Sequence, residues 1–206
     1  AEQYDIVSSF PLLWSGIILW LAQRRAAPVR IANFRNSLSE KRTLLTNPAY
    51  VWLMRSLIKR SATHVVAVSQ AALASAFPPV WQRARTCQVI YNGLPMAAFQ
   101  GSAERQQVRA EFGWPADCRI VINVARFSPQ KNHKTIVEAT RLLYEQDKSI
   151  RLLLVGGGKP GEALQGWLAA DGVDKICALA GRRTDVPRLL RAADLFLFPS
   201  LWEGLP

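Results

Sequence analysis

The stretch that decides the fold is Ala193–Pro206, with the sequence ADLFLFPSLWEGLP. Its apolar run from Leu195 to Phe198 is short and ends at a proline, which predicts a buried strand rather than a helix. In open parallel sheets, ligands bind beyond the carboxyl ends of the strands. Glu203 follows this strand beside Gly204, where backbone can approach a ligand closely, so Glu203 is a candidate site residue. The alternative is a solvated carboxylate in an ordinary loop.

Composition limits the class of protein. Half of the 206 residues are hydrophobic, and the three cysteines are scattered, which favours a reducing compartment over disulfides or a zinc site. The apolar stretch from Phe10 to Ala22 is too short to span a bilayer and lacks the basic lead-in of a signal peptide. We therefore expect a cytoplasmic protein. Because the chain ends in a loop, with no helix returning it to the sheet, we also expect a fragment of a longer protein.

The positive charge is concentrated in the first half of the chain. The net charge is +11, and nine Lys or Arg residues fall between Arg24 and Arg60, where Glu40 is the only acidic residue. Such a region attracts polyanions, which include nucleic acid, anionic lipid and phosphorylated small molecules. Charge alone does not choose among these three classes.

Strand-like runs alternate with helical patterns along the whole chain. The expected strands are 5–9, 29–34, 64–69, 87–91, 120–124, 152–155, 176–180 and 195–198. The expected helices are 15–25, 50–58, 70–76, 104–112, 133–145, 162–170 and 186–192. This alternation predicts right-handed crossovers and parallel sheets. With a linker at 94–102, it predicts an α/β fold of two Rossmann-like domains, 1–97 and 98–206, both incomplete in this chain.

The helix expected at residues 50–58 allows two interpretations. Its apolar residues recur at helical spacing, and three cations lie off that stripe. The favoured interpretation is a surface helix packed on a sheet. The rival is a basic amphipathic helix that rests on an anionic membrane, with Trp52 at the interface.

The expected strand ends in the second half carry residues suited to a phosphorylated ligand. Arg126 and Lys131 flank a proline turn and could converge on one diphosphate, although a solvated basic loop is the alternative. Gly156 and Gly157 would allow close backbone approach, or form an ordinary tight turn. Gly181 and Arg182 precede a helix start whose amides suit an anion or a base edge. No DxD motif or His/Cys cluster indicates a metal site, so these cations would neutralise the phosphates themselves.

Three segments give the second half a family resemblance. They are Asn123–Asn132 (NVARFSPQKN), Leu154–Gly158 (LVGGG) and Ala193–Pro206. In this register they resemble the C-terminal domain of retaining glycosyltransferases of group 1 (family 4), which have the GT-B fold. Upstream, Val89–Leu94 is similar to the interdomain junction of that family. Residues 30–37 and 62–69 are similar to the end of the N-terminal domain in polysaccharide-biosynthesis members.

The resemblance implies roles for matching positions only. Arg126 and Lys131 would bind the donor diphosphate and stabilise it as leaving group, while Glu203, the first Glu of the family's E-x7-E motif, would contact the donor sugar. The remaining donor-binding positions would be Gly156, Gly157, Gly181, Arg182, Gly204 and Leu205. The second Glu of that motif would follow the end of the chain, and the family's glycine-rich loop would precede Ala1. The His that many members carry after an early strand is replaced here by Ser8, Ser9 and Phe10.

The resemblance therefore implies a metal-independent retaining glycosyltransferase of hexosyltransferase type. It would move a sugar from a nucleotide-sugar to a glycan or lipid-linked acceptor in cell-surface polysaccharide or glycolipid synthesis, without nucleic acid. The domains would be the end of an acceptor-side domain and the start of a nucleotide-sugar-binding domain. Its place would be the cytoplasm, with peripheral contact at the inner face of the plasma membrane. The alternatives are a basic module that binds nucleic acid or another polyanion, and a non-catalytic GT-B-like domain.

Overall fold

The computed structural model describes residues 3–10, 12–36, 47–79, 84, 86–101, 104–158 and 162–204. The chain divides into two compact units, Ala1–Gly93 with Trp202–Pro206, and Leu94–Leu201. Each unit is described by itself below. The assignment of 1–97 and 98–206 to an acceptor-side and a donor-side domain stays a prediction.

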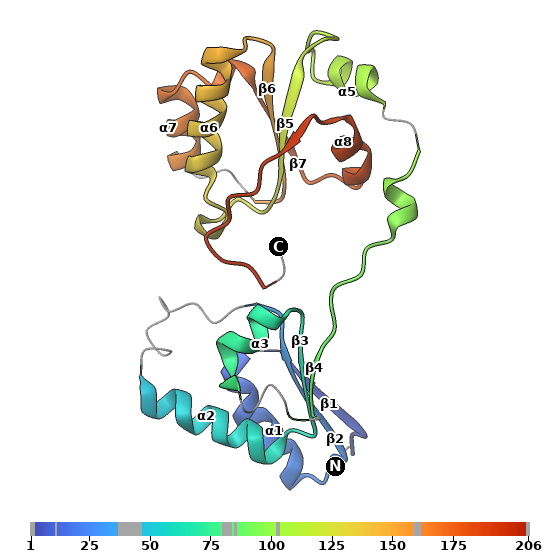
Figure 1. Ribbon diagram of the computed structural model, residues 1–206, viewed down its shortest axis with the longest axis vertical. Helices are drawn as coiled ribbons and strands as arrows, with labels where there is room; N and C mark the ends of the chain where they lie inside the picture. The colour runs from blue at the N-terminus through green and yellow to red at the C-terminus, as the bar shows by residue number, and fades with distance from the viewer. Residues whose placement is uncertain are drawn as a thin grey trace. The chain divides into compact units, whose positions relative to one another are not determined.

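The first unit is built on a four-stranded parallel sheet in the order β1-β2-β3-β4 (Figure 1). Its strands are β1 (Ile6–Ser9), β2 (Val29–Phe34), β3 (His64–Ala67) and β4 (Cys87–Val89). Its helices are η1 (Leu12–Trp14), α1 (Ser15–Arg24), α2 (Pro48–Ser61) and α3 (Gln70–Ala76), where η marks a 3-10 helix. One hydrophobic core, which includes the edge-to-face pair Phe34 and Phe77, joins sheet and helices.

Local sequence explains where these helices begin and how two of them pack. Asn47 caps α2, because its side chain accepts hydrogen bonds from the amides of Ala49 and Tyr50, and Pro48 occupies the first helical position. On α1, a Cβ added at Gly16 would lie 2.7 Å from the carbonyl oxygen of Met54. Glycine at this position therefore allows α1 and α2 to approach closely.

The second unit has a second four-stranded parallel sheet, in the order β7-β6-β5-β8. Its strands are β5 (Arg119–Val124), β6 (Ile150–Val155), β7 (Cys177–Gly181) and β8 (Leu195–Phe196). Its α-helices are α5 (Arg105–Glu111), α6 (His133–Gln146), α7 (Glu162–Ala170) and α8 (Val186–Ala192). Its described residues also include the 3-10 helices η3 (Met96–Phe99), η4 (Pro129–Lys131) and η5 (Asp174–Ile176).

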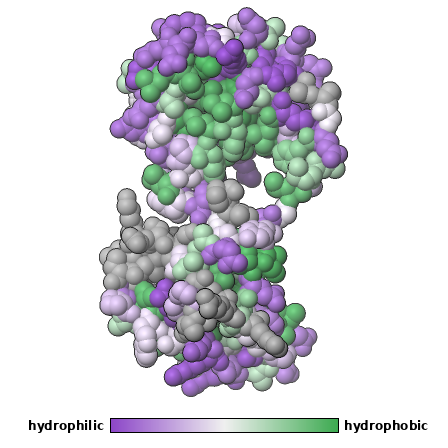
Figure 2. Space-filling view, viewed as in Figure 1, coloured by the Kyte–Doolittle hydropathy of each residue, from purple (hydrophilic) through white to green (hydrophobic). Residues whose placement is uncertain are grey.

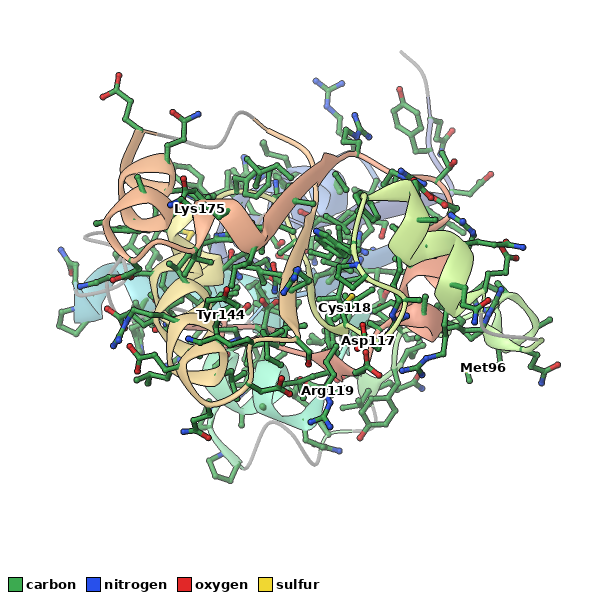
Figure 3. The ribbon with its side chains drawn as sticks, turned by 90° about the horizontal axis from the view of Figure 1, so that it is seen from above. Met96, Asp117, Cys118, Arg119, Tyr144 and Lys175 are labelled. Atoms are coloured by element: carbon green, nitrogen blue, oxygen red, sulfur yellow. The ribbon has the colours of Figure 1, made fainter. Side chains whose placement is uncertain are left out.

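Helices cover both faces of this second sheet. One core lies between the sheet and α6 with α7, and the other between the sheet and α5 with α8. Successive strand residues alternate between the two cores, so Val121 belongs to the first and Ile120 and Ile122 to the second. Seen from above, Cys118 and Arg119, where the chain enters β5, lie between α6, which carries Tyr144, and α5 (Figure 3). Both units thus show the Rossmann-like α/β arrangement expected from the alternating pattern.

The prediction of a buried strand at 195–198 was wrong in length and burial. Strand β8 ends at Phe196, and the side chains of Leu195 and Phe196 are 47% and 51% exposed. Within the described residues β8 pairs only with β5, so it is an edge strand. Figure 2 shows a hydrophobic area of surface over this part of the second unit. Within the segment expected as a linker, 94–102, residues Met96–Phe99 form η3.

No helix in the described part of the chain is both long enough and apolar enough to cross a membrane.

Candidate functional site

The two predicted diphosphate cations lie on the loop that joins β5 to α6. After β5, the amide of Phe127 donates to the carbonyl of Gly157, and η4 then brings the chain to Lys131. Arg126 is exposed, whereas Lys131 is half-buried, with its Nζ 4.7 Å from the centre of the Phe198 ring. Asn132 adopts a left-handed conformation (φ 51°, ψ 50°) that turns the chain into α6. This backbone geometry fixes the positions of the Arg126 and Lys131 side chains beyond the carboxyl end of β5.

The predicted glycines lie at the carboxyl ends of β6 and β7, beside this loop. A Cβ on Gly156 would lie 1.7 Å from the carbonyl oxygen of Ala125, so packing of β6 against the end of β5 already requires glycine here. The amide of Gly156 donates to the carbonyl of Gly181, which has a φ of +64°. A Cβ on Gly157 would lie 2.9 Å from Cγ of Arg182, so the arginine stem lies over Gly157. The structure thus brings Gly156, Gly157, Gly181 and Arg182 together.

The segment after β8 is hydrogen-bonded to β5 at one point and to the β5–α6 loop at another. The side-chain amide of Asn123 donates to the carbonyl of Leu197 over 2.8 Å, and the amide of Leu201 donates to the carbonyl of Gln130, also over 2.8 Å. Asn123 is buried within the apolar part of β5. Sequence reasoning missed its role, although a lone Asn in the run IVINVA was the available signal.

Asp194 was missed in the same way. Its carboxylate accepts hydrogen bonds from the amide of Ile120, from buried Arg109 and from exposed Arg105. These bonds anchor the chain at the start of β8, immediately before the segment that carries the candidate site residues.

Glu203 and Gly204 belong to the part of the chain that clusters with the first unit. Glu203 is half-buried and Gly204 is buried. The Ser69 hydroxyl donates to the carbonyl of Gly204, and a Cβ on Gly204 would lie 1.9 Å from the carbonyl oxygen of Arg35. Leu205 lies outside the described residues. The predicted roles of all three in donor binding stay predictions.

Arg183, next to Arg182, belongs to an ion-pair network that stabilises the fold. It pairs with Asp185 and Glu111, and Arg188 pairs with Asp185, Glu111 and Glu104, which joins α8 to α5. Hydrogen bonds from Arg183 and then Arg188 hold the pKa of Asp185 well below its ordinary value. Hydrogen bonds from Arg188 and Arg183 likewise lower the pKa of Glu111. Arg182, by contrast, is exposed beside the glycines.

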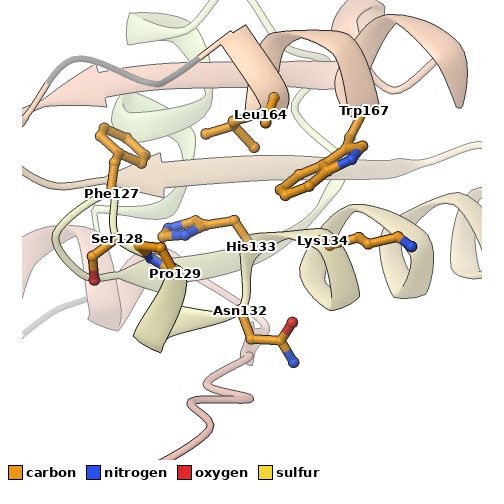
Figure 4. A pocket seen from close by; sticks show the side chains of 9 residues that line it. Phe127, Ser128, Pro129, Asn132, His133, Lys134, Leu164 and Trp167 are labelled. Atoms are coloured by element: carbon orange, nitrogen blue, oxygen red, sulfur yellow. The ribbon is translucent and has the colours of Figure 1, made fainter. Parts of the chain in front are cut away.

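A cavity of about 390 Å³ lies between the start of α6 and α7 (Figure 4). Its walls include Phe127, Leu164 and Trp167, with His133 across from them. The His133 side chain is buried, which lowers its pKa, and its Nε2 has no hydrogen-bond partner among the described residues. None of the predicted site residues lines this cavity. The described residues also contain no group of three or more His, Cys, Asp or Glu side chains placed to hold a metal ion.

Comparisons with known proteins agree with this architecture. The family model for glycosyl transferases group 1 matches residues 104–206. The putative glycosyltransferase EpsF of Bacillus subtilis (strain 168) is 27% identical over 198 residues, 93% of this chain and 50% of that protein. The UDP-Gal:alpha-D-GlcNAc-diphosphoundecaprenol alpha-1,3-galactosyltransferase of Escherichia coli is 30% identical over 122 residues, 57% of this chain and 32% of that enzyme. The chain therefore spans half or less of the length of these curated relatives.

Solved structures give the same fold. Anabaena Alr3699/HepE in complex with UDP superposes with a TM-score of 0.78 at 25% identity, covering 96% of this chain and 53% of that chain. WaaG, a glycosyltransferase involved in lipopolysaccharide biosynthesis, has a TM-score of 0.65 at 19% identity, covering 83% of this chain and 50% of that one. With two parallel-sheet units, the fold is of the GT-B type, and the chain belongs to the glycosyl transferases of group 1.

Proposed function

We propose that the protein carrying this chain is a retaining glycosyltransferase of family 4 that transfers a hexose from a nucleotide-sugar to an acceptor hydroxyl. The observation that carries the proposal is the rim of the second sheet, where Arg126 and Lys131 share one loop beside Gly156, Gly157 and Arg182. This rim lies inside the region that matches the family model.

The proposed chemistry is stabilisation of a leaving diphosphate. The bond from the anomeric carbon to a diphosphate oxygen breaks, a bond to the acceptor oxygen forms on the same face of the sugar, and the acceptor hydroxyl gives its proton to the departing diphosphate. Negative charge develops on the diphosphate, where Arg126 would bind bidentately and Lys131 as a compact point charge. These two cations would take the place of a metal ion. Glu203, Gly204 and Leu205 would contact the donor sugar and its phosphates.

We further propose a glycan or lipid-linked acceptor and a role in cell-surface polysaccharide or glycolipid synthesis. One relative is named for a diphosphoundecaprenol acceptor. On α2, Trp52 is 69% exposed and lies on the same helix as the exposed cations Lys59 and Arg60, which suits peripheral contact with an anionic membrane at the cytoplasmic side. Binding to anionic liposomes at low salt, weakened in Trp52→Ser, is the expected result. No binding to such liposomes would remove the membrane part of the proposal.

Thermal melting of the chain with UDP-, GDP- and ADP-sugars tests the donor site, because a ligand that binds only the folded state raises Tm. We expect a rise with one nucleotide-sugar that is lost in Lys131→Ala and in Arg126→Ala. The control is Lys134→Ala, which removes an exposed cation three residues further on that pairs with Glu138. An equal rise in Lys131→Ala and in the unsubstituted chain would refute the proposed role of Lys131.

The rival function, a polyanion-binding module, rests on the charge of the first half of the chain. Single-stranded DNA is its probe in the same melts. A rise in Tm with DNA alone, abolished by salt, would favour the rival function over the glycosyltransferase proposal.

A further inference from the structure

The aromatic ring of Phe198 is in direct contact with a proposed diphosphate cation. Lys131 Nζ lies 4.7 Å from the ring centre, within the range of about 6 Å in which a cation is attracted to an aromatic face. Both residues belong to the second unit and are separated by 67 positions in the chain, since 198 − 131 = 67. The contact is therefore a product of the fold and not of local sequence.

The backbone on both sides of this contact is fixed. On the Phe198 side, the amide of Leu197 donates to the carbonyl of Ile122, and the carbonyl of Leu197 accepts from Asn123. On the Lys131 side, the amide of Lys131 donates to the carbonyl of Ser128 over 3.0 Å. The amide of Leu201 donates to the carbonyl of Gln130, the residue before Lys131, and so joins the two segments directly. The Phe198 ring and the Lys131 ammonium group therefore project from two backbone segments that hydrogen bonds hold side by side.

The ring itself is oriented by a second aromatic residue. Phe196 and Phe198 have ring centres 5.5 Å apart and planes 18° apart, which is a stacked arrangement. Stacking limits the rotation of the Phe198 ring, so the face that meets Lys131 stays turned toward it. A lysine side chain otherwise has large rotamer freedom, and ordering it before ligand arrives reduces the entropy lost on binding.

We propose that Phe198 is a positioning residue that holds the Lys131 ammonium group, by a cation–π contact, where it meets the donor diphosphate. This inference rests on the proposed function, because it assigns Lys131 to that diphosphate. Phe198 would bind no ligand atom itself, and its effect would pass through Lys131.

The test replaces Phe198 with mono-, di- and trifluorinated phenylalanine, which weakens the negative face of the ring while nearly keeping its shape. Isothermal titration with UDP and with inorganic pyrophosphate measures affinity. An exposed cation–π contact contributes about 0.5–1 kcal/mol, so we expect affinity to fall stepwise by about 2- to 5-fold over the series. Phe198→Tyr should retain affinity. The same series at Phe112, whose ring packs against Trp114 at the end of α5, controls for fluorination elsewhere in the second unit and should leave affinity unchanged.

Two further measurements separate this inference from the proposed function. In the Lys131→Ala background the Phe198 series should have no effect on affinity. The Lys131 CεH2 protons, assigned by comparison with Lys131→Arg, should show an upfield ring-current shift without ligand that is lost in Phe198→Leu. If Lys131→Ala weakens UDP binding but the fluorination series does not, the positioning role is wrong and the proposed function stands. If Lys131→Ala leaves affinity unchanged, the diphosphate role of Lys131 is wrong, whatever the ring-current shift shows, and this inference falls with it.

Discussion

The two units share an architecture and use their charged side chains in opposite ways. Between Asp5 and Glu104 the sequence has one acidic residue, Glu40, and in the first unit Arg30 is satisfied by backbone carbonyls instead. In the second unit, arginines and carboxylates form ion-pair networks that fasten α5, α8 and β8. Helices of the second unit are thus held partly by ion pairs, whereas Arg30 shows that an arginine of the first unit can use backbone carbonyls as its partners. It follows that a change of pH, or the substitution of a charged residue, should change the stability of the two units by different amounts.

The largest expected effect is in the second unit, at buried Arg109. Arg109→Met leaves Asp194 with exposed Arg105 and the amide of Ile120, and removes donors from the carbonyls of Cys118 and Ala192. We expect a loss of roughly 3 kcal/mol in the free energy of unfolding, measured by urea denaturation. Arg105→Met is the matched control, because Arg105 pairs with the same carboxylate from an exposed position and should cost less than about 1 kcal/mol. Equal losses in the two variants would contradict the assigned importance of burial.

Acid should destabilise the second unit before the first. Asp185 and Glu111 have pKa values lowered by hydrogen bonds from arginine, so the stability they contribute is fully present above the unfolded-chain value of about 4. It is lost as pH falls from there through the lower folded-state values. Hydrogen exchange, corrected for intrinsic rates, should show α5 and α8 opening first at low pH. In Glu111→Gln this pH dependence should be shallower, and simultaneous opening of α2 and α8 would contradict the comparison.

A smaller effect is expected at Arg30 in the first unit. Its guanidinium donates to the carbonyls of Ser61, Ala27 and Pro28, so Arg30→Met should lower the free energy of unfolding by about 1–2 kcal/mol, because water can replace part of these bonds. Arg30→Lys should recover only part of the loss, since lysine lacks the guanidinium fork. The loss should be insensitive to salt. A loss that disappears at high salt would mean that Arg30 acts through charge and not through carbonyl geometry.

The smallest stability effect is expected at the exposed cations Arg25 and Arg60 of the first unit. Arg25→Gln with Arg60→Gln should change the free energy of unfolding by less than about 0.5 kcal/mol. The double variant should nevertheless elute earlier from a heparin column. A control that replaces Lys134 and Arg141 of the second unit, which pair with Glu138 and Glu145, should elute close to the unsubstituted chain. Equal shifts in the two double variants would show that net charge, and not its location, governs retention.

Sequence reasoning was most successful where periodicity carries the information. The predicted ranges 29–34, 70–76, 162–170 and 186–192 coincide with β2, α3, α7 and α8, because a single face or run of apolar residues defines each element. The GT-B fold was predicted correctly from motifs in register. Burial of β8 was not, because burial of a strand depends on which neighbours cover it and not on its own composition.

The candidate site was predictable only in part. Arg126, Lys131 and the glycines could be picked out because they follow strand ends in a parallel sheet. Gly156 shows the limit of that logic, since close packing against Ala125 requires glycine there even without a ligand. The contacts of Asp194 with Arg109 and of Phe198 with Lys131 join residues far apart in the chain. In each pair, the sequence around one residue does not indicate which distant residue it contacts.

The edge position of β8 has a consequence for handling the isolated chain. Leu195–Phe198 is a run of four apolar residues with high strand propensity, and part of it lies exposed at the edge of a sheet. Such an edge can template pairing with a second copy, which is the first step toward aggregation. Asp194 and Pro199 bracket the run, in the way that charged residues and prolines limit the growth of intermolecular sheets. We therefore expect the purified chain to become turbid as its concentration rises, through pairing of β8 edges. Phe196→Lys, which places a charge on this edge, should suppress the turbidity.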